Sequence, residues 1–292
     1  PTARRSDRPR AKDGATLKAP PMNNHDYQNL PGISSHWLIE MLNSPAACWR
    51  KYLDPRRPAE EQTAALRLGT LVHCLALTPR QFEREFLVAD YERRSVAGKA
   101  RYAAMQQSGL TMVKPAELDQ ARAIVAALHA SPESRKLLRG GKKERTIIQS
   151  RARGLLPLKA RLDIHHEAKR QVVEFKTTWN LTAAQATMER YRYPLSAAFY
   201  RDVVRGQSTV FVFVQTREPF EVAVIPMERQ QLQAGQAQWQ TALARFDACW
   251  RANEWPEAEP AVPDDDPLLM NFIPAKAAAR QRFELPVGEL AL

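Results

Sequence analysis

Four residues that can do acid–base or metal chemistry lie on two neighbouring segments of the chain. Arg161 and Asp163 precede a short polar stretch, and Glu174 and Lys176 follow it. If residues 168–169 form the tip of an antiparallel hairpin, Asp163 faces Glu174 and Arg161 faces Lys176. Side chains alternate along a strand, so all four then point to the same face of the hairpin.

The expected proximity of Asp163 and Glu174 implies a cation. Directly opposed residues have Cβ atoms about 4.5–5.5 Å apart, and two carboxylates that close repel unless a cation or a proton lies between them. A hard divalent metal with oxygen ligands fits this arrangement. On the same face, Lys176 can orient an attacking water as an ammonium, or activate the water when it is deprotonated.

An ordinary strand surface with cross-strand salt bridges is the alternative interpretation of this hairpin. Against it, Val172, Val173 and Phe175 make the second strand look central and buried. Buried acids beside a buried lysine are uncommon outside functional sites. The pattern therefore favours an active site, provided that the register holds, because a slip of one residue moves a strand's side chains to the other face.

The patterns along the chain predict an α/β fold in which helices flank a central mixed β-sheet. Helices are expected at residues 34–42, 45–52, 64–77, 115–139 (broken near residues 131–132), 182–204 and 228–252. Strands are expected at residues 145–150, 157–165, 171–178, 209–215 and 220–226. Between these elements, residues 54–63 read as a loop and residues 80–113 contain a basic, polar segment.

Composition excludes several classes of protein. The chain has 292 residues, of which 44% are hydrophobic, enough for a sizeable core and unlike a disordered or fibrous chain. No run approaches the roughly 18 apolar residues of a membrane helix, and no signal peptide is visible. Cys48, Cys74 and Cys249 are scattered, which argues against a disulfide framework and a four-thiolate iron–sulfur cluster. We therefore expect a cytoplasmic protein with no membrane partner.

Charge is distributed unevenly and divides the chain into three parts. Residues 1–24 are expected to form a basic flexible arm, residues 25–253 one folded domain, and residues 254–292 a Pro-rich acidic tail. The whole chain has a net charge of +11. A basic body suggests a polyanionic partner, nucleic acid above all, although a merely soluble basic protein is the alternative.

Several motifs together resemble a known group of nucleases. The run LKARLD at residues 158–163, followed by VEFKTT at residues 173–178, resembles the PD-(D/E)XK nuclease signature. Around it stand YQNLPGISS at residues 27–35, LRLGTLVH at residues 66–73 and YRYPLSAAFY at residues 191–200. The ordered set resembles the RecE (exonuclease VIII) nuclease domain, within the wider RecB-like and lambda-exonuclease group, over about residues 25–225.

The resemblance implies a metal site. His73, Asp163, Glu174 and the backbone carbonyl of Phe175 would hold one or two Mg²⁺ ions, with Mn²⁺ as a substitute. Lys176 would be the catalytic lysine. Glu144 matches a glutamate near the metals or the attacking water, while a solvated charge is its alternative interpretation. For His73 the alternative is a histidine packed within its helix.

Contacts with DNA are also implied. The residues concerned are Ser34 and Ser35 at the 5′ phosphate, Arg93, Arg94 and Lys99 along the DNA track, and Arg161 and Tyr200. Plain helix capping is the alternative for the serines, and a solvated helix face for the basic residues. The group usually carries Gln-x-x-x-Tyr on the helix after the lysine strand. Here Ser196 replaces the glutamine, and Tyr200 is either the retained tyrosine or a core aromatic.

For the whole protein, the resemblance implies a restriction-endonuclease-like core and a Mg²⁺-dependent exodeoxyribonuclease. It would digest double-stranded DNA 5′→3′ from ends, release mononucleotides and leave 3′ single strands for a single-strand annealing recombinase in DNA recombination and repair. The protein would be bacterial or phage-encoded and form a closed ring, a trimer rather than a tetramer. The alternatives are a structure-specific or restriction-type endonuclease with the same metal site, and a catalytically inactive DNA-binding scaffold.

Overall fold

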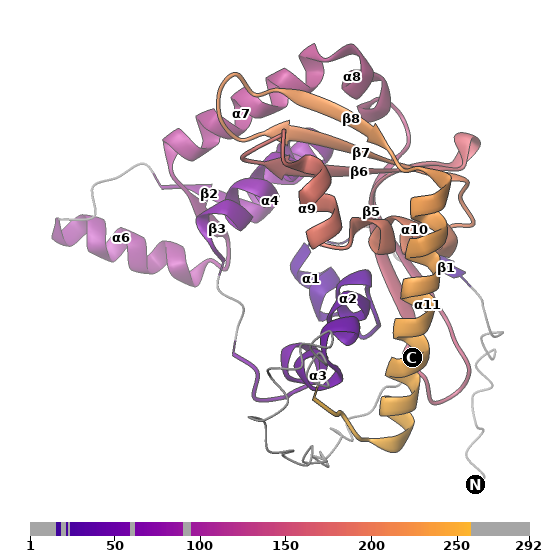
Figure 1. Ribbon diagram of the computed structural model, residues 1–292. Helices are drawn as coiled ribbons and strands as arrows, with labels where there is room; N and C mark the ends of the chain where they lie inside the picture. Colours follow the sequence, from indigo (N-terminus) through magenta and orange to yellow (C-terminus); the bar gives the residue numbers. More distant parts are fainter. Residues whose placement is uncertain (1–15, 19–21, 23, 59–61, 90–94, 258–292) are drawn as a thin grey trace, which may run out of the picture.

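A six-stranded mixed sheet forms the centre of the molecule (Figure 1). The computed structural model describes residues 16–18, 22, 24–58, 62–89 and 95–257. The sheet order is β1 (Thr16–Lys18), β4 (Lys142–Gln149), β5 (Leu158–His166), β6 (Gln171–Thr178), β7 (Ser208–Gln215) and β8 (Val222–Pro226). Within this sheet, as far as the structure describes it, β6 and β7 pair in parallel and the other neighbouring strands are antiparallel, so the predicted mixed sheet is confirmed.

Helices cover both faces of this sheet. One face packs against α4 (Ala64–Leu77), α7 (Pro115–Ala130) and α8 (Pro132–Leu138). The other packs against α2 (Ser35–Asn43), α3 (Pro45–Tyr52), α10 (Tyr193–Val203) and α11 (Arg229–Ala252). Figure 1 shows α7 and α8 on the opposite side of β7 and β8 from α10 and α11. In this arrangement the middle strands β5, β6 and β7 are buried, as their apolar sequences require.

Most helix boundaries follow from capping residues and prolines. The Thr63 hydroxyl accepts the Leu66 N–H at 3.2 Å and begins α4, and the helix ends before Pro79. The break predicted within residues 115–139 occurs at Ser131, since Pro132 begins α8. These local signals explain why the predicted and observed ends agree.

One expectation about the helices is wrong. The single helix expected over residues 182–204 is two helices, α9 (Ala184–Arg190) and α10. Arg192 between them has a left-handed φ of 52°, and Pro194 in the first turn of α10 cannot continue a preceding helix.

The stretch that the sequence characterises only as basic and polar, residues 80–113, contains short elements. These are η1 (Pro79–Gln81), α5 (Phe82–Glu85), β2 (Phe86–Val88), α6 (Val96–Gln107) and β3 (Thr111–Val113).

The ends of the folded domain extend beyond the predicted boundaries. Thr16–Lys18 pairs with β4, and α1 (Asn24–Asn29) follows, so the flexible arm predicted over residues 1–24 is wrong at these residues. At the other end, Glu257 forms an ion pair of 2.5 Å with Arg50 on α3. The remainder of the predicted tail lies outside the described residues. None of the helices in the described ranges is long and apolar enough to cross a membrane.

The hairpin of β5 and β6 has the predicted register, but the two strands pair only over the three residue pairs next to the turn. Ile164 pairs with Val173, as a tip at residues 168–169 requires, and η2 (Glu167–Lys169) forms the turn. The ladder includes no pair beyond this one towards Asp163. Leu162 belongs to the apolar cluster beneath α10, whereas Ile164 belongs to the cluster beneath α4. These two side chains therefore lie on opposite faces of the sheet, although an uninterrupted strand would place them on the same face. Alternation is therefore interrupted at Asp163.

The segment before α2 fills the space beside β5. Ile33 forms a parallel bridge with Leu158, with its N–H donating to the Pro157 carbonyl at 2.8 Å. Gly32 has a φ of 149°, and a Cβ there would lie 3.1 Å from the Pro157 carbonyl and 3.2 Å from the Lys159 Cβ. Only glycine fits this close approach, which fixes where α2 begins.

Lys159 anchors the same segment from the strand. Its buried ammonium donates to the carbonyls of Tyr27 at 3.1 Å, Gln28 at 3.0 Å and Leu30 at 2.7 Å. These carbonyls belong to the end of α1, where a helix has no partners of its own for its last acceptors. Burial lowers the pKa of Lys159 to about 8, and three carbonyl acceptors offset the cost of burying the charge.

We predict that Lys159→Met lowers the free energy of unfolding by about 1–3 kcal/mol, because buried carbonyls lose their donor. Denaturant unfolding followed by circular dichroism measures the change. Lys143→Met, at an exposed lysine of β4, is the control and should be nearly neutral. Equal stability of the two variants would show that Lys159 does not hold the α1–α2 segment.

Candidate active site

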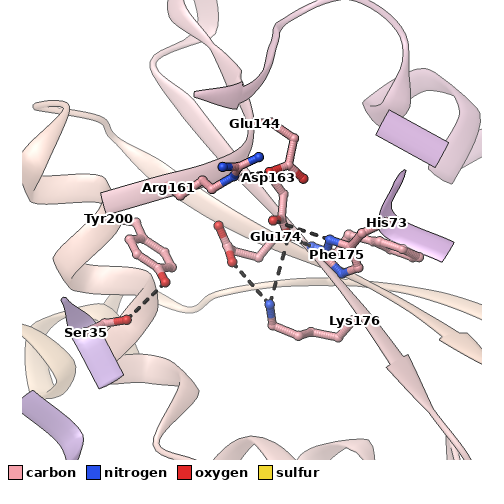
Figure 2. A network of polar contacts seen from close by, with 9 residues as sticks. All are labelled: Ser35, His73, Glu144, Arg161, Asp163, Glu174, Phe175, Lys176 and Tyr200. Carbon is pink, nitrogen blue, oxygen red and sulfur yellow. Dashed lines mark hydrogen bonds and ion pairs between the residues drawn. The ribbon is translucent and has the colours of Figure 1, made fainter. Parts of the chain in front are cut away.

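The candidate site lies where β5 and β6 separate (Figure 2). Helices on both faces of the sheet contribute side chains to it. Each flanking element supplies one or more residues: His73 from α4, Glu144 from β4, Arg161 and Asp163 from β5, Glu174, Phe175 and Lys176 from β6, Ser35 from α2, and Tyr200 from α10. The structure therefore brings together most of the residues singled out from the sequence.

His73, Glu144 and Asp163 form a cluster suited to a metal ion. One ligand atom from each lies within 4.8 Å of the others. The His73 Nδ1 is 3.6 Å from the Asp163 Oδ1, and the His73 ring packs against the Phe175 ring at 4.6 Å between centroids. His73 is thus held by an aromatic neighbour and directed at a carboxylate, rather than packed only among the apolar residues of α4.

Glu144 adopts a left-handed backbone conformation beside Asp163. Its φ is 48°, while Lys143 pairs with Ile164 and Arg145 with Leu162 on either side. The ladder places Glu144 opposite Asp163 but leaves this pair out. A non-glycine residue held at positive φ is unfavourable and is often found at functional sites. The conformation coincides with the interruption at Asp163.

Arg161 pairs with Glu144 inside the site. Its Nε donates to the Glu144 Oε2, and its Nη1 donates to the Met22 carbonyl at 3.1 Å. The Arg161 guanidinium also lies 5.8 Å from the Tyr27 ring centroid. Arg161, predicted as a DNA contact, is therefore engaged in contacts that orient Glu144.

The Asp163 side chain accepts a backbone N–H that would otherwise be available for pairing between β5 and β6. Its Oδ2 accepts the Phe175 backbone N–H at 2.7 Å, and its Oδ1 faces His73. The carboxylate is thereby fixed between β5 and β6 at the point where the ladder ends. A hydrogen bond from a backbone N–H to a carboxylate is charge-assisted and holds the group in one orientation.

Glu174 and Lys176 each influence the pKa of the other. Burial raises the pKa of Glu174, and repulsion by Asp163 raises it further, to about 8. The Lys176 Nζ lies 3.3 Å from the Glu174 Oε2 and 3.9 Å from the Asp163 Oδ2. Burial lowers the pKa of Lys176, but the carboxylates of Glu174 and Asp163 more than offset this and raise it above its usual value. Lys176 is therefore an ammonium, which can orient a water or a phosphate oxygen.

The hydrogen bonding of the Glu174 carboxylate indicates whether a cation could bind in this site. The Oε1 of Glu174 is buried and has no hydrogen-bond partner among the described residues. A buried carboxylate oxygen left unpaired is costly, and a cation bound between Glu174 and Asp163 would pair it. Imidazole and carboxylate donors together suit a divalent metal. The residues present thus fit a metal site formed by His73, Glu144 and Asp163, to which the unpaired oxygen of Glu174 would add a further carboxylate.

Ser35 and Tyr200 close the site on the side of α10. Ser35 is fully buried and its hydroxyl donates to the Tyr200 hydroxyl at 3.0 Å. Burial raises the pKa of Tyr200, and the nearby Glu174 carboxylate adds to the shift. Ser34, the N-cap residue of α2, forms no side-chain capping hydrogen bond. The predicted phosphate role of Ser34 and Ser35 stays a prediction, with the Ser35 hydroxyl directed at Tyr200.

Lys99 is exposed on α6. Arg93 and Arg94 lie outside the described residues.

Sequence reasoning missed Tyr193, the first residue of α10. Burial raises the pKa of its phenol, and the Lys176 ammonium partly counters the shift. Tyr193 is thus a neighbour of the candidate catalytic lysine. The available sequence signal was the motif at residues 191–200, which had already been singled out. Tyr193 lies in it, two residues before Leu195.

A mixed sheet whose central hairpin presents Asp163 and the Glu174-x-Lys176 pair beside a helical histidine defines the PD-(D/E)XK class. The family comparison is specific within this class. Residues 34–260 match the family described as "PDDEXK-like domain of unknown function (DUF3799)". The match spans most of the chain, which therefore belongs to this family.

Two solved structures show similarity to this chain. The crystal structure named "Putative exonuclease" from Eubacterium rectale is 15% identical, with a TM-score of 0.56, and the match covers 89% of this chain and 96% of that chain. A phage related exonuclease from Haemophilus somnus 129PT is 12% identical, with a TM-score of 0.34 and coverage of 76% and 96%. The first likeness supports the fold assignment. We found no match among curated proteins.

We predict that Mg²⁺ or Mn²⁺ raises the melting temperature of the protein and that Glu174→Gln removes most of this increase. A ligand that binds only the folded state stabilises it by an amount that grows with the logarithm of the ligand concentration relative to Kd, and the variant weakens binding by removing one carboxylate ligand. Thermal unfolding with and without the metal measures the difference. Glu133→Gln, at an exposed acid of α8, is the control and should keep the full increase. An unchanged metal response in Glu174→Gln would contradict the assigned site.

Proposed function

We propose that this chain is a Mg²⁺-dependent exodeoxyribonuclease that digests double-stranded DNA from its ends. The observation that carries the proposal is the convergence of His73, Asp163, Glu174 and Lys176, with the Glu174 Oε1 unpaired. Metal-binding carboxylates beside a lysine are suited to phosphodiester hydrolysis, because the reaction develops negative charge on phosphate oxygens.

The protein groups have distinct tasks in this proposal. His73, Asp163 and Glu174 would hold the ion, with Glu144 and the Phe175 carbonyl as further ligands. A divalent ion bound there would polarise the scissile phosphate and stabilise the charge that develops on it. The Lys176 ammonium would orient the attacking water for in-line displacement.

Supporting groups keep these residues in place. The Phe175 N–H orients Asp163 at 2.7 Å, and Arg161 orients Glu144. Glu174 is buried, and the hydrogen-bonded pair of Ser35 and Tyr200 lies on the α10 side of it (Figure 2). A fixed and partly dehydrated arrangement strengthens each electrostatic interaction with the substrate.

Digestion from 5′ ends, with release of mononucleotides and a residual 3′ strand, is the specific activity that we propose. Its support is the resemblance of the motifs to RecE-like nucleases and, more weakly, the name of the similar structure from Eubacterium rectale. The same resemblance supports a closed homo-oligomeric ring, a trimer rather than a tetramer, and delivery of the 3′ strand to a single-strand annealing recombinase for recombination and repair.

The substrate distinguishes an exonuclease from an endonuclease with the same site. We predict that Mg²⁺ supports digestion of end-labelled linear duplex DNA, and that covalently closed circular DNA stays intact. Blocking the 5′ ends should stop digestion, while blocking the 3′ ends should not. Cutting of the closed circle would establish the endonuclease alternative, and protection by 3′ blocks alone would reverse the polarity.

Single substitutions test the catalytic assignment. We predict that Asp163→Ala and Lys176→Ala each lower the rate of DNA digestion by at least about 100-fold, because each removes a charge at the reacting phosphate. Lys169→Ala, at an exposed lysine of the hairpin turn, is the control and should digest DNA at the rate of the parent protein. Circular dichroism checks that all variants are folded.

Two outcomes would count against the assignment. Digestion by either variant at the parental rate would show that the chemistry lies elsewhere. A parent protein that binds duplex DNA but does not digest it with Mg²⁺ or Mn²⁺ would support the inactive scaffold instead.

A further inference from the structure

Two exposed aromatic side chains follow the strand that carries Glu174 and Lys176. Trp179 is 67% exposed and Tyr191 is 52% exposed. Tyrosine and tryptophan are enriched at binding interfaces, because each ring is apolar at one end and polar at the other. Neither Trp179 nor Tyr191 belongs to the candidate metal site, so a separate role has to be considered for these exposed rings.

Trp179 is positioned rigidly beside the site. It lies three residues beyond Lys176, about 10 Å along the chain at the rise of a strand. The guanidinium of Arg217 lies 4.4 Å from the Trp179 ring centroid. The loop that carries Arg217 is fixed by a bond from the Thr216 N–H to the Thr178 carbonyl at 2.8 Å.

Tyr191 is connected to the central sheet through a series of stacked rings. Arg190 lies 5.6 Å from the Tyr191 ring centroid. The Tyr191 and Tyr193 rings stack at 6.1 Å with an interplanar angle of 25°. Tyr193 in turn stacks with the Phe213 ring at 6.3 Å, and Phe213 pairs with Lys176 between β7 and β6. The exposed ring of Tyr191 is thus connected through two further rings to the strand position of the catalytic lysine.

Each exposed ring therefore has an arginine beside it. Neither Arg190 nor Arg217 forms an ion pair with an acid among the residues that the structure describes. Their acidic chain neighbours are Glu189, which accepts a bond from Gln185 on α9, and Glu218. An aromatic face offers stacking to any nucleobase, and a guanidinium attracts the adjoining phosphates. This combination suits an unpaired nucleic-acid strand better than an apolar protein surface.

We propose that Trp179 and Tyr191, together with Arg217 and Arg190, form a stacking surface for unpaired bases of a nucleic-acid strand beside Lys176. We name these four residues the aromatic rim. The inference rests on the proposed nuclease function, because it takes the bound strand to be one that the metal site cuts or leaves behind.

Binding without cleavage tests the rim independently of catalysis. Full-length protein is titrated against labelled oligo(dT) in EDTA, and fluorescence anisotropy gives the affinity. Trp179→Ala should weaken binding by about tenfold or more, since stacking on one ring contributes that much. Trp179→Phe retains an aromatic face and should lose much less. Tyr191→Ala should also weaken binding.

Controls separate stacking from other causes. Val96→Ala, at an exposed apolar residue of α6, should bind oligo(dT) like the parent protein. The indole emission that differs between the parent and Trp179→Phe should be quenched on adding oligo(dT). Blunt duplex DNA should bind the parent and Trp179→Ala within about twofold, because paired bases do not expose their faces.

Three results would overturn the proposal: oligo(dT) affinity unchanged in Trp179→Ala, an equal loss in Trp179→Phe, or a lower molar mass of Trp179→Ala by light scattering. The last would show that the rim contacts a second copy of this chain. Failure of the nuclease proposal is visible separately, since it appears as absent digestion with Mg²⁺ while oligo(dT) binding in EDTA is still measured.

Discussion

The burial of two carboxylates beside each other is the constraint on which this structure depends. Asp163 and Glu174 are both buried, and burial together with repulsion by Asp163 raises the pKa of Glu174 to about 8. The Lys176 ammonium, at 3.3 Å from Glu174, compensates part of this charge, yet the Glu174 Oε1 stays unpaired among the described residues. Such an arrangement is unfavourable as a structural feature, because buried charge needs compensation. It is understandable as a site prepared for a divalent cation.

The sheet is interrupted to create this arrangement. Had β5 and β6 continued as a regular hairpin, the Phe175 N–H would have been available for strand pairing; instead the Asp163 carboxylate accepts it at 2.7 Å. The space that opens beside β5 is filled by the segment at Gly32 and Ile33, which fixes the start of α2. Helices α2, α4 and α10 can then each direct one side chain to the same point.

Local sequence signals predicted the elements well and the interruption poorly. The turn and the apolar alternation were enough to set the pairing of Ile164 with Val173. They could not show that alternation fails at Asp163, since the cause is a contact between a side chain and the neighbouring strand. The left-handed Glu144 and the bond from Ser35 to Tyr200 depend on tertiary packing in the same way. Asp163 and Glu174 could be singled out because carboxylate chemistry is visible in residue type and spacing, whereas His73 and Glu144 were singled out only through the resemblance to RecB-like nucleases.

The most direct test of this account is the position of the metal itself. A crystal grown with Mn²⁺ and measured at the manganese absorption edge would reveal the ion by its anomalous signal. The account predicts a peak between His73, Asp163 and Glu174, within ligand distance of the Glu174 Oε1. A crystal saturated with Mn²⁺ that shows no peak there, or shows one only at other residues, would contradict it.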